Sequence, residues 1–227
     1  VIRIWNAETL TQRLVLEGEA ECVGAHLHAD AEIDPAADLP LIRLNAALTR
    51  LDLRTLEQSL PHTALSAELA LARDNGLLDG TVRLSNAAKG PYDAGRVPIA
   101  AANARLRTDL KRIDLAGLMI DLGTGALRGS AEVSADRAAV SLTARDVNLA
   151  VLHGALHTTR LGGKADAVIE HERQSAIAHL TQDDMRLNLH VVREGAMVTL
   201  REAVLHARGG EATARGELAL DAQRRFS

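Results

Sequence analysis

Apolar and polar residues alternate along most of this chain. In residues 25–33 (AHLHADAEI) the odd positions are Ala, Leu or Ile, and the even positions are His, Asp or Glu. The same period of two recurs in residues 42–49, 65–71, 78–84, 102–107, 113–122, 127–133, 140–145, 165–169, 185–191, 198–205 and 218–220. A period of two is typical of strands with one apolar and one solvated face, and here it predicts about 13 to 15 strands.

Short turns separate most of these predicted strands. Asp74-Asn75-Gly76, Gly123-Thr124-Gly125 and Glu194-Gly195 each join two alternating segments. Asn and Gly tolerate positive φ, so such turns favour hairpins, and neighbouring strands are predicted to pair antiparallel. Residues 86–98 are predicted to form the one long loop. Gly80, Gly129 and Gly216 each begin an alternating run, which predicts a bulge or a bend.

One stretch occurs twice. Residues 51–71 align without a gap to residues 147–167, with identical pairs Leu53/Leu149, Leu56/Leu152, Leu60/Leu156, Thr63/Thr159 and Leu65/Leu161. Asp52 and Asn148 occupy the same place in the two copies, and both residue types are preferred helix N-caps. Leu53, Leu56 and Leu60 fall on one face of about two helical turns. Each copy therefore predicts a short capped helix followed by a new strand.

Composition helps to choose between closed and open arrangements of the predicted strands. A sandwich or a barrel would close it, whereas one long, strongly curved sheet would leave it as the wall of a groove. Only Trp5, Tyr92 and Phe226 are aromatic, although aromatic side chains dominate compact cores. Many apolar positions are Ala. These features favour an all-β fold with one or two short helices, in which a long curved antiparallel sheet forms a taco-like groove with an apolar concave face.

The apolar side chains of the alternating segments are the candidate groove-lining residues. Residues 1–227 are interpreted as a single internal fragment of a repetitive β-groove domain, because the chain starts at Val1 and ends at Ser227 in strand-like sequence. The predicted lining residues are Leu44, Leu48, Leu69, Leu71, Val82, Leu84, Leu106, Leu115, Ile120, Leu127, Val133, Val140, Leu142, Ile169, Leu187, Leu189, Val198, Leu200, Leu205, Leu218 and Leu220.

The sequence offers little catalytic chemistry. A net charge of −4, with 26 basic and 30 acidic residues interspersed, gives no basic stripe for nucleic acid. Cys22 is the single cysteine, which excludes an internal disulfide and a cysteine-based metal cluster. His26 and His28, or His153 and His157, could begin a zinc site, but no carboxylate or Cys stands at a ligand spacing beside them. We therefore expect solvated histidines, a solvated turn at 183–184, no metal, no cofactor and no enzyme activity.

Two stretches carry a resemblance to a known family. Residues 80–99 (GTVRLSNAAKGPYDAGRVPI) and 112–133 (RIDLAGLMIDLGTGALRGSAEV) resemble the repetitive β region of the TamB/AsmA-like family of Gram-negative bacteria. The resemblance implies the periplasmic part of an inner-membrane-anchored protein that bridges the two membranes. It also implies phospholipid as cargo, and a TamA-like outer-membrane partner that acts through parts outside this fragment.

Three functional hypotheses follow. In the first, the apolar groove shields and conducts phospholipid acyl chains. In the second, the groove or the free strand edges serve as a chaperone or scaffold for outer-membrane β-barrel proteins such as autotransporters. The third is a purely structural β-solenoid, against which the irregular spacing of Gly80, Gly129 and Gly216 counts. Open strand edges also predict end-to-end self-association.

Overall fold

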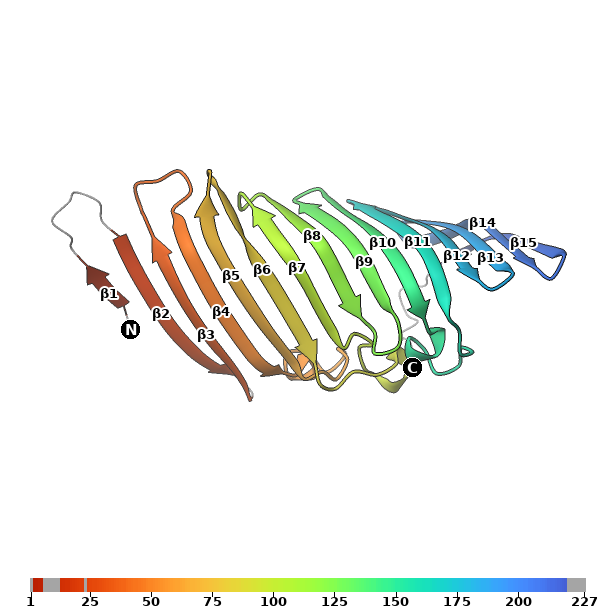
Figure 1. Cartoon of the computed structure of the whole chain (residues 1–227), viewed down its shortest axis with the longest axis horizontal. Coiled ribbons are helices and arrows are strands. Elements are labelled where there is room, and N and C mark those ends of the chain that lie inside the picture. The colour runs from red at the N-terminus through yellow and green to blue at the C-terminus, as the bar shows by residue number, and fades with distance from the viewer. Residues whose placement is uncertain (1, 6–12, 23, 220–227) are drawn as a thin grey trace.

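All the strands belong to one antiparallel sheet in which each strand pairs with its neighbours in sequence (Figure 1). The computed structural model describes residues 2–5, 13–22 and 24–219. The 15 strands lie in chain order from β1 to β15. Their bounds are β1 Ile2–Trp5, β2 Arg13–Cys22, β3 Ala25–Ile33, β4 Leu41–Leu51, β5 Leu65–Asp74, β6 Leu77–Asn86, β7 Ala101–Thr108, β8 Arg112–Asp121, β9 Ala126–Ser134, β10 Arg137–Val147, β11 Leu161–Glu170, β12 Arg173–Gln182, β13 Met185–Glu194, β14 Met197–Ala207 and β15 Gly210–Ala219. The predicted fold class, an all-β chain with a long curved antiparallel sheet, is confirmed.

The alternating pattern located most strands but missed three. Residues 25–33 form β3 as predicted, whereas β1, β2 and β12 were absent from the predicted series. In β12 the large apolar side chain of Ile177 pairs with His190 on the polar side, and Gln174 pairs with Arg193 on the apolar side. These two exchanges hide the period of two, so β12 could not be read from alternation alone.

The predicted turns connect the strands as expected. Asn75 and Gly76 have φ of 49° and 79°, and Gly123, Gly125 and Gly195 also have positive φ. The loop between β6 and β7 covers residues 87–100, close to the predicted 86–98. It contains one 3-10 turn, η2, Tyr92–Ala94. Two further connections, 52–64 and 148–160, are nearly as long.

Glycine is required where neighbouring strands approach each other most closely. A Cβ on Gly80 would lie 1.8 Å from the carbonyl oxygen of Ala70 in β5, and a Cβ on Gly129 would lie 1.8 Å from that of Ser141 in β10. Glycine kinks of this kind introduce curvature into sheets. Both glycines belong to the apolar side, because they pair with Leu71 and Leu142. Gly216 has open space around it, and no close approach requires glycine there.

The sequence repeat forms two equivalent corners, but the predicted helices are wrong in length. Each corner contains one 3-10 turn, η1 Leu53–Thr55 or η3 Leu149–Val151. The predicted N-caps are confirmed: Asp52 accepts a hydrogen bond from the Arg54 N–H, and Asn148 accepts one from the Ala150 N–H. The helix stops after one turn because the chain folds back to begin the next strand. Leu56 consequently points into solvent instead of continuing a helical face.

A threonine holds each corner closed. The Thr63 hydroxyl accepts a hydrogen bond from the Leu53 N–H (2.9 Å) and donates one to the Leu51 carbonyl (3.1 Å). Thr159 makes the same two bonds with Leu149 and Val147. The Thr63 N–H donates to the Asp52 carboxylate, and this bond is the main reason why the pKa of Asp52 lies below its ordinary value. The repeated threonine is therefore structural.

Replacing Thr63 by Val is expected to destabilise the chain by about 2 kcal/mol, because two backbone groups in a largely buried position lose their partner. Chemical denaturation monitored by circular dichroism measures this. Thr63→Ser keeps the hydroxyl and should cost less than Thr63→Val, while Thr143→Val on the solvated face should be neutral. Equal stability of Thr63→Val and wild type would contradict the role given to this hydroxyl.

The loop 87–100 links the two corners. The His62 N–H donates to the Gly95 carbonyl (2.8 Å), and the Tyr92 N–H donates to the Leu152 carbonyl (3.0 Å). Asn86, which is buried, ties the start of the loop to the first corner by accepting hydrogen bonds from the Ala64 and Ala88 N–H groups. We call the three segments 52–64, 87–100 and 148–160 the corner ridge. The ridge lies along the lower edge of the sheet in Figure 1.

The sheet has no conventional core. Among the described residues few apolar side chains are buried, and four of them are alanine or lie in a connection: Ala25, Leu71, Leu78, Pro98, Ala104, Leu122, Val147 and Val192. The accessible surface is 15466 Å², compared with about 10,000 Å² for a compact monomer of this size. The architecture is a single layer.

Candidate functional site

The strand register places the aliphatic side chains on one continuous face. Cross-strand partners in a sheet point to the same side, and the pairs can be followed from strand to strand. Leu44 pairs with Leu71, which pairs with Gly80, which pairs in turn with Leu106. The same series of cross-strand pairs extends through the following strands to Leu200 in β14 and Gly216 in β15. We call this side the apolar face.

Twenty of the predicted lining residues lie on the apolar face, in four rows that run across the strands. Leu220 lies outside the described residues. The row nearest the corner ridge contains Leu48, Leu84, Ile120, Leu127, Leu187 and Leu205. The second row contains Leu69, Val82, Leu142 and Leu189. The third row contains Leu44, Leu71, Leu106, Leu115, Val140 and Leu200. The fourth row contains Val133, Ile169, Val198 and Leu218. Leu180 of β12 completes the first row and was missed with its strand.

No second layer packs against the apolar face within residues 2–5, 13–22 and 24–219. Contacts between strands in this part of the chain are almost all between neighbours in the sheet, apart from a small contact of β4 with β6. Most side chains of the face are half-buried by their own neighbours, and Ile113, Val133, Ile169, Leu205 and Leu218 are exposed. An apolar surface of this extent marks an interaction site in a protein surrounded by water.

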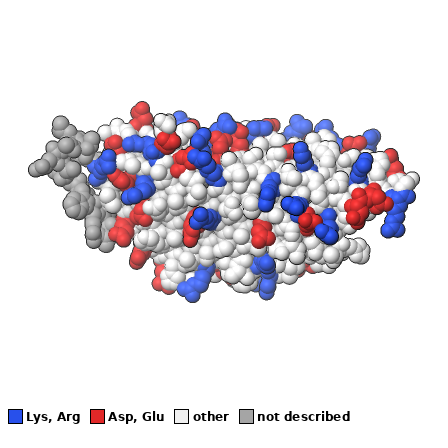
Figure 2. All heavy atoms as spheres, in the orientation of Figure 1, with Lys and Arg blue, Asp and Glu red and all other residues white. Residues whose placement is uncertain are grey.

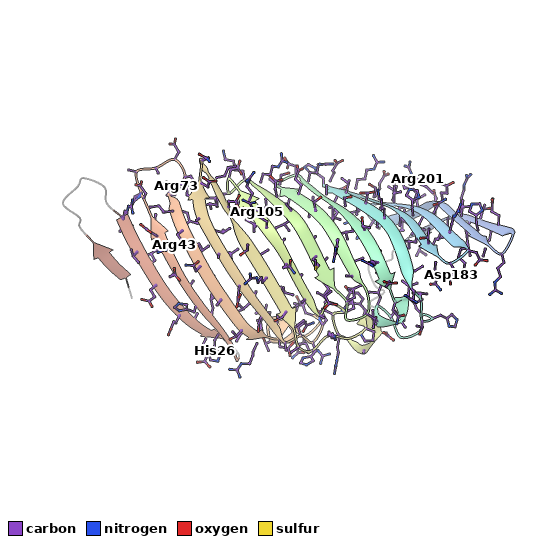
Figure 3. The ribbon with its side chains drawn as sticks, viewed as in Figure 1. His26, Arg43, Arg73, Arg105, Asp183 and Arg201 are labelled. Atoms are coloured by element: carbon purple, nitrogen blue, oxygen red, sulfur yellow. The ribbon has the colours of Figure 1, made fainter. Side chains whose placement is uncertain are left out.

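The fourth row carries the polar exceptions of the apolar face. Arg73 pairs with Leu78, Thr108 with Ile113, and Gln174 with Arg193. Arg73 donates a hydrogen bond to the Leu39 carbonyl (2.7 Å) and lies 3.8 Å from Asp34; Figure 3 shows it at the edge opposite the corner ridge. The aliphatic rows are therefore bordered by a polar rim on that side.

The opposite face of the sheet is charged and internally paired. Asp79 of β6 accepts hydrogen bonds from Arg105 and Arg107 of β7. These bonds, with that to Arg105 the strongest, lower the pKa of Asp79 to about 2. A shallow hollow of about 570 Å³ lies on this face, where the small side chains of Ala47 and Thr81 stand between longer charged ones. Figure 2 shows charges of both signs scattered over the visible surface without a field of one sign.

The histidines and acidic residues do not assemble a metal site. Within the described part of the chain no group of three or more His, Cys, Asp or Glu side chains is placed to hold an ion. His26 lies 3.0 Å from the Arg50 guanidinium, and Asp183 with Asp184 forms an exposed turn as predicted. Sequence spacing missed the carboxylates beside three of the candidate histidines. Glu21 lies 3.9 Å from His26, Glu19 lies 3.6 Å from His28, and Asp93 lies 4.0 Å from His153. A bond from the Gly154 N–H is the main cause that lowers the pKa of Asp93. The side chain of Cys22 lies outside the described residues.

The described residues contain no helix with both the length and the apolar character needed to cross a bilayer. Comparison of the chain with protein-family models, with curated proteins and with solved structures finds no match.

Proposed function

We propose that the apolar face shields the acyl chains of phospholipid and lets them move along the sheet. The observation that carries this proposal is the uncovered apolar face, whose first three rows are built of aliphatic residues and glycine from β3 to β15. Twelve strand spacings of about 4.8 Å give it a length of about 60 Å. A site of this length suits a chain-like apolar ligand that passes along it, and it does not resemble an enclosed pocket for one small molecule.

The chemistry of the face suits acyl chains. Each methylene group that leaves water for an aliphatic surface contributes about 0.8 kcal/mol. Leu, Val, Ile and Ala offer no directional bond, so a bound chain keeps its freedom to slide. The polar rim with Arg73 and Arg193 borders the fourth row, where phosphate head groups would remain in contact with water and with cationic side chains.

The resemblance to the TamB/AsmA-like family supports the same proposal. It would place the chain in the periplasmic part of an inner-membrane-anchored bridge, with a TamA-like partner reached through other parts of the protein. Neither the proposed transport nor the proposed location requires a cofactor.

The free edge at β15 favours a second candidate function. Every residue of β15 is exposed, and β15 pairs with β14 alone among the described strands. An extended segment of an unfolded barrel protein could pair there by β-augmentation. Photo-cross-linking separates the candidates: adducts of lipid at Leu142 support conduction, whereas adducts of peptide at Thr213 support a scaffold.

Mass spectrometry of lipid that co-purifies with the chain tests the main proposal. We expect phospholipid to accompany the protein through gentle purification and to be displaced by excess detergent, because the face holds acyl chains without specific bonds. A chain that carries no lipid and takes none up from added phospholipid would contradict the proposal.

A further inference from the structure

The corner ridge is one connected surface built from three separate parts of the sequence. The Gly154 N–H donates to the Asp93 carboxylate at 2.9 Å, beside the bond between Tyr92 and Leu152. The first corner joins the loop through His62 and Gly95. Corners at β4–β5 and β10–β11 are separated by about six strand spacings, or about 29 Å, so the ridge is a long edge of the molecule.

Each of the three segments exposes one large apolar side chain. Leu56 is 61% exposed, Tyr92 59% and Leu156 45%. These side chains contribute to neither the apolar face nor a core. Tyr92 is the single tyrosine of a chain with three aromatic residues, and tyrosine is enriched where proteins meet the membrane–water interface.

The same ridge carries cations that have no acidic partner. Within the described residues Arg54, Lys89 and Arg96 form no ion pair, in contrast to Arg105 and Arg107 on the charged face. The ridge also carries three carboxylates, which keep their negative charge while they make local contacts; with Arg160 the basic residues outnumber them by one. Asp52 lies 2.7 Å from His62, Glu57 accepts a hydrogen bond from Ser59, and Asp93 holds Gly154. Figure 2 shows basic groups on the lower margin of the molecule.

We propose that the corner ridge docks on a bilayer surface that contains anionic phospholipid. Such a surface satisfies both features at once, since Leu and Tyr side chains enter the interface while Arg and Lys lie near phosphate groups. This proposal does not depend on the function proposed for the apolar face.

Vesicle flotation with the 227-residue chain tests the proposal. We expect binding to vesicles of equal parts phosphatidylcholine and phosphatidylglycerol, and much weaker binding to phosphatidylcholine alone. Replacing Arg54, Lys89 and Arg96 together by Gln is expected to weaken binding about a hundredfold, at about fivefold for each charge near the surface. Replacing Leu56, Tyr92 and Leu156 by Ser should also release the chain from the vesicles.

Matched variants test whether a loss of vesicle binding is specific to the ridge, or results from any change in net charge or any loss of an exposed apolar side chain. Lys111, Arg137 and Arg173 lie at the opposite edge, and replacing them together by Gln changes the net charge equally. Leu110→Ser removes a leucine that is also 61% exposed and lies at that edge. Both controls should bind like the wild type. The proposal is overturned by equal losses in the ridge and control variants. It is also overturned if the wild-type chain does not bind anionic vesicles. That result would favour a protein as the partner of the ridge. Unchanged melting temperatures verify folding.

Discussion

Leu142→Glu is expected to reduce phospholipid binding at least tenfold while the sheet remains folded. Leu142 stands in the second row of the apolar face, between Gly129 and Ala165. A carboxylate there removes contact with about two methylene groups at about 0.8 kcal/mol each, and 1.4 kcal/mol already corresponds to a factor of ten. Titration with a fluorescent phospholipid, together with mass spectrometry of co-purified lipid, measures the loss.

The neighbouring residue provides the control. Thr143 points to the opposite face, where its cross-strand partners are Arg128 and Lys164, so Thr143→Glu gains two cationic neighbours and should bind lipid normally. The two variants have the same charge and lie one position apart. Normal lipid binding by a folded Leu142→Glu variant would remove the apolar face from the proposed mechanism, and an equal loss in both variants would point to charge alone.

Gly80→Ala is expected to destabilise the chain by about 3 kcal/mol, at the upper end of the typical cost of overpacking. The added methyl carbon would meet the Ala70 carbonyl oxygen at 1.8 Å and the Leu71 Cα at 2.9 Å. Backbone atoms cannot rotate away as a side chain does, so β5 and β6 must separate or flatten. Thermal and chemical unfolding followed by circular dichroism give the change in stability.

Gly18→Ala is the matched substitution. Gly18 also lies within a strand on the apolar face, opposite Ala29 in β3, but nothing stands within 4 Å of an added Cβ. Its replacement should be neutral or stabilising by up to about 1 kcal/mol, since alanine restricts the unfolded chain. If Gly80→Ala and Gly18→Ala unfold alike, the close approach of β5 and β6 is not what requires glycine at position 80.

The corner ridge joins distant strands along one edge of the single-layer sheet. Strand-to-strand hydrogen bonds hold each strand to its neighbours alone. The threonine-closed corners and the loop 87–100 add hydrogen bonds that connect β4–β5 with β10–β11. Gly80 and Gly129, where strands approach most closely, lie between the two corners.

The face to which each side chain belongs was readable from the sequence. Alternation has a period of two, and a slip of one residue would move every side chain of a strand to the other face. For this reason residues such as Leu69, Leu142 and Leu187 could be assigned together before their partners were known. The turn at Asn75-Gly76 and the caps at Asp52 and Asn148 were also readable, because each depends on a few adjacent residues.

Tertiary structure alone decided whether the apolar face is covered and what joins the corners. A strand with one apolar side looks the same in a sandwich, a barrel or an open sheet, since its local pattern does not record what lies above it. The bonds from Tyr92 to Leu152 and from Gly154 to Asp93 connect residues about sixty positions apart. The crowding at Gly80 likewise depends on the path of another strand. The sequence by itself determined which side chains share a face, because that is a local property of the backbone; the open face, the ridge and the bends result from contacts between segments that no short-range pattern specifies.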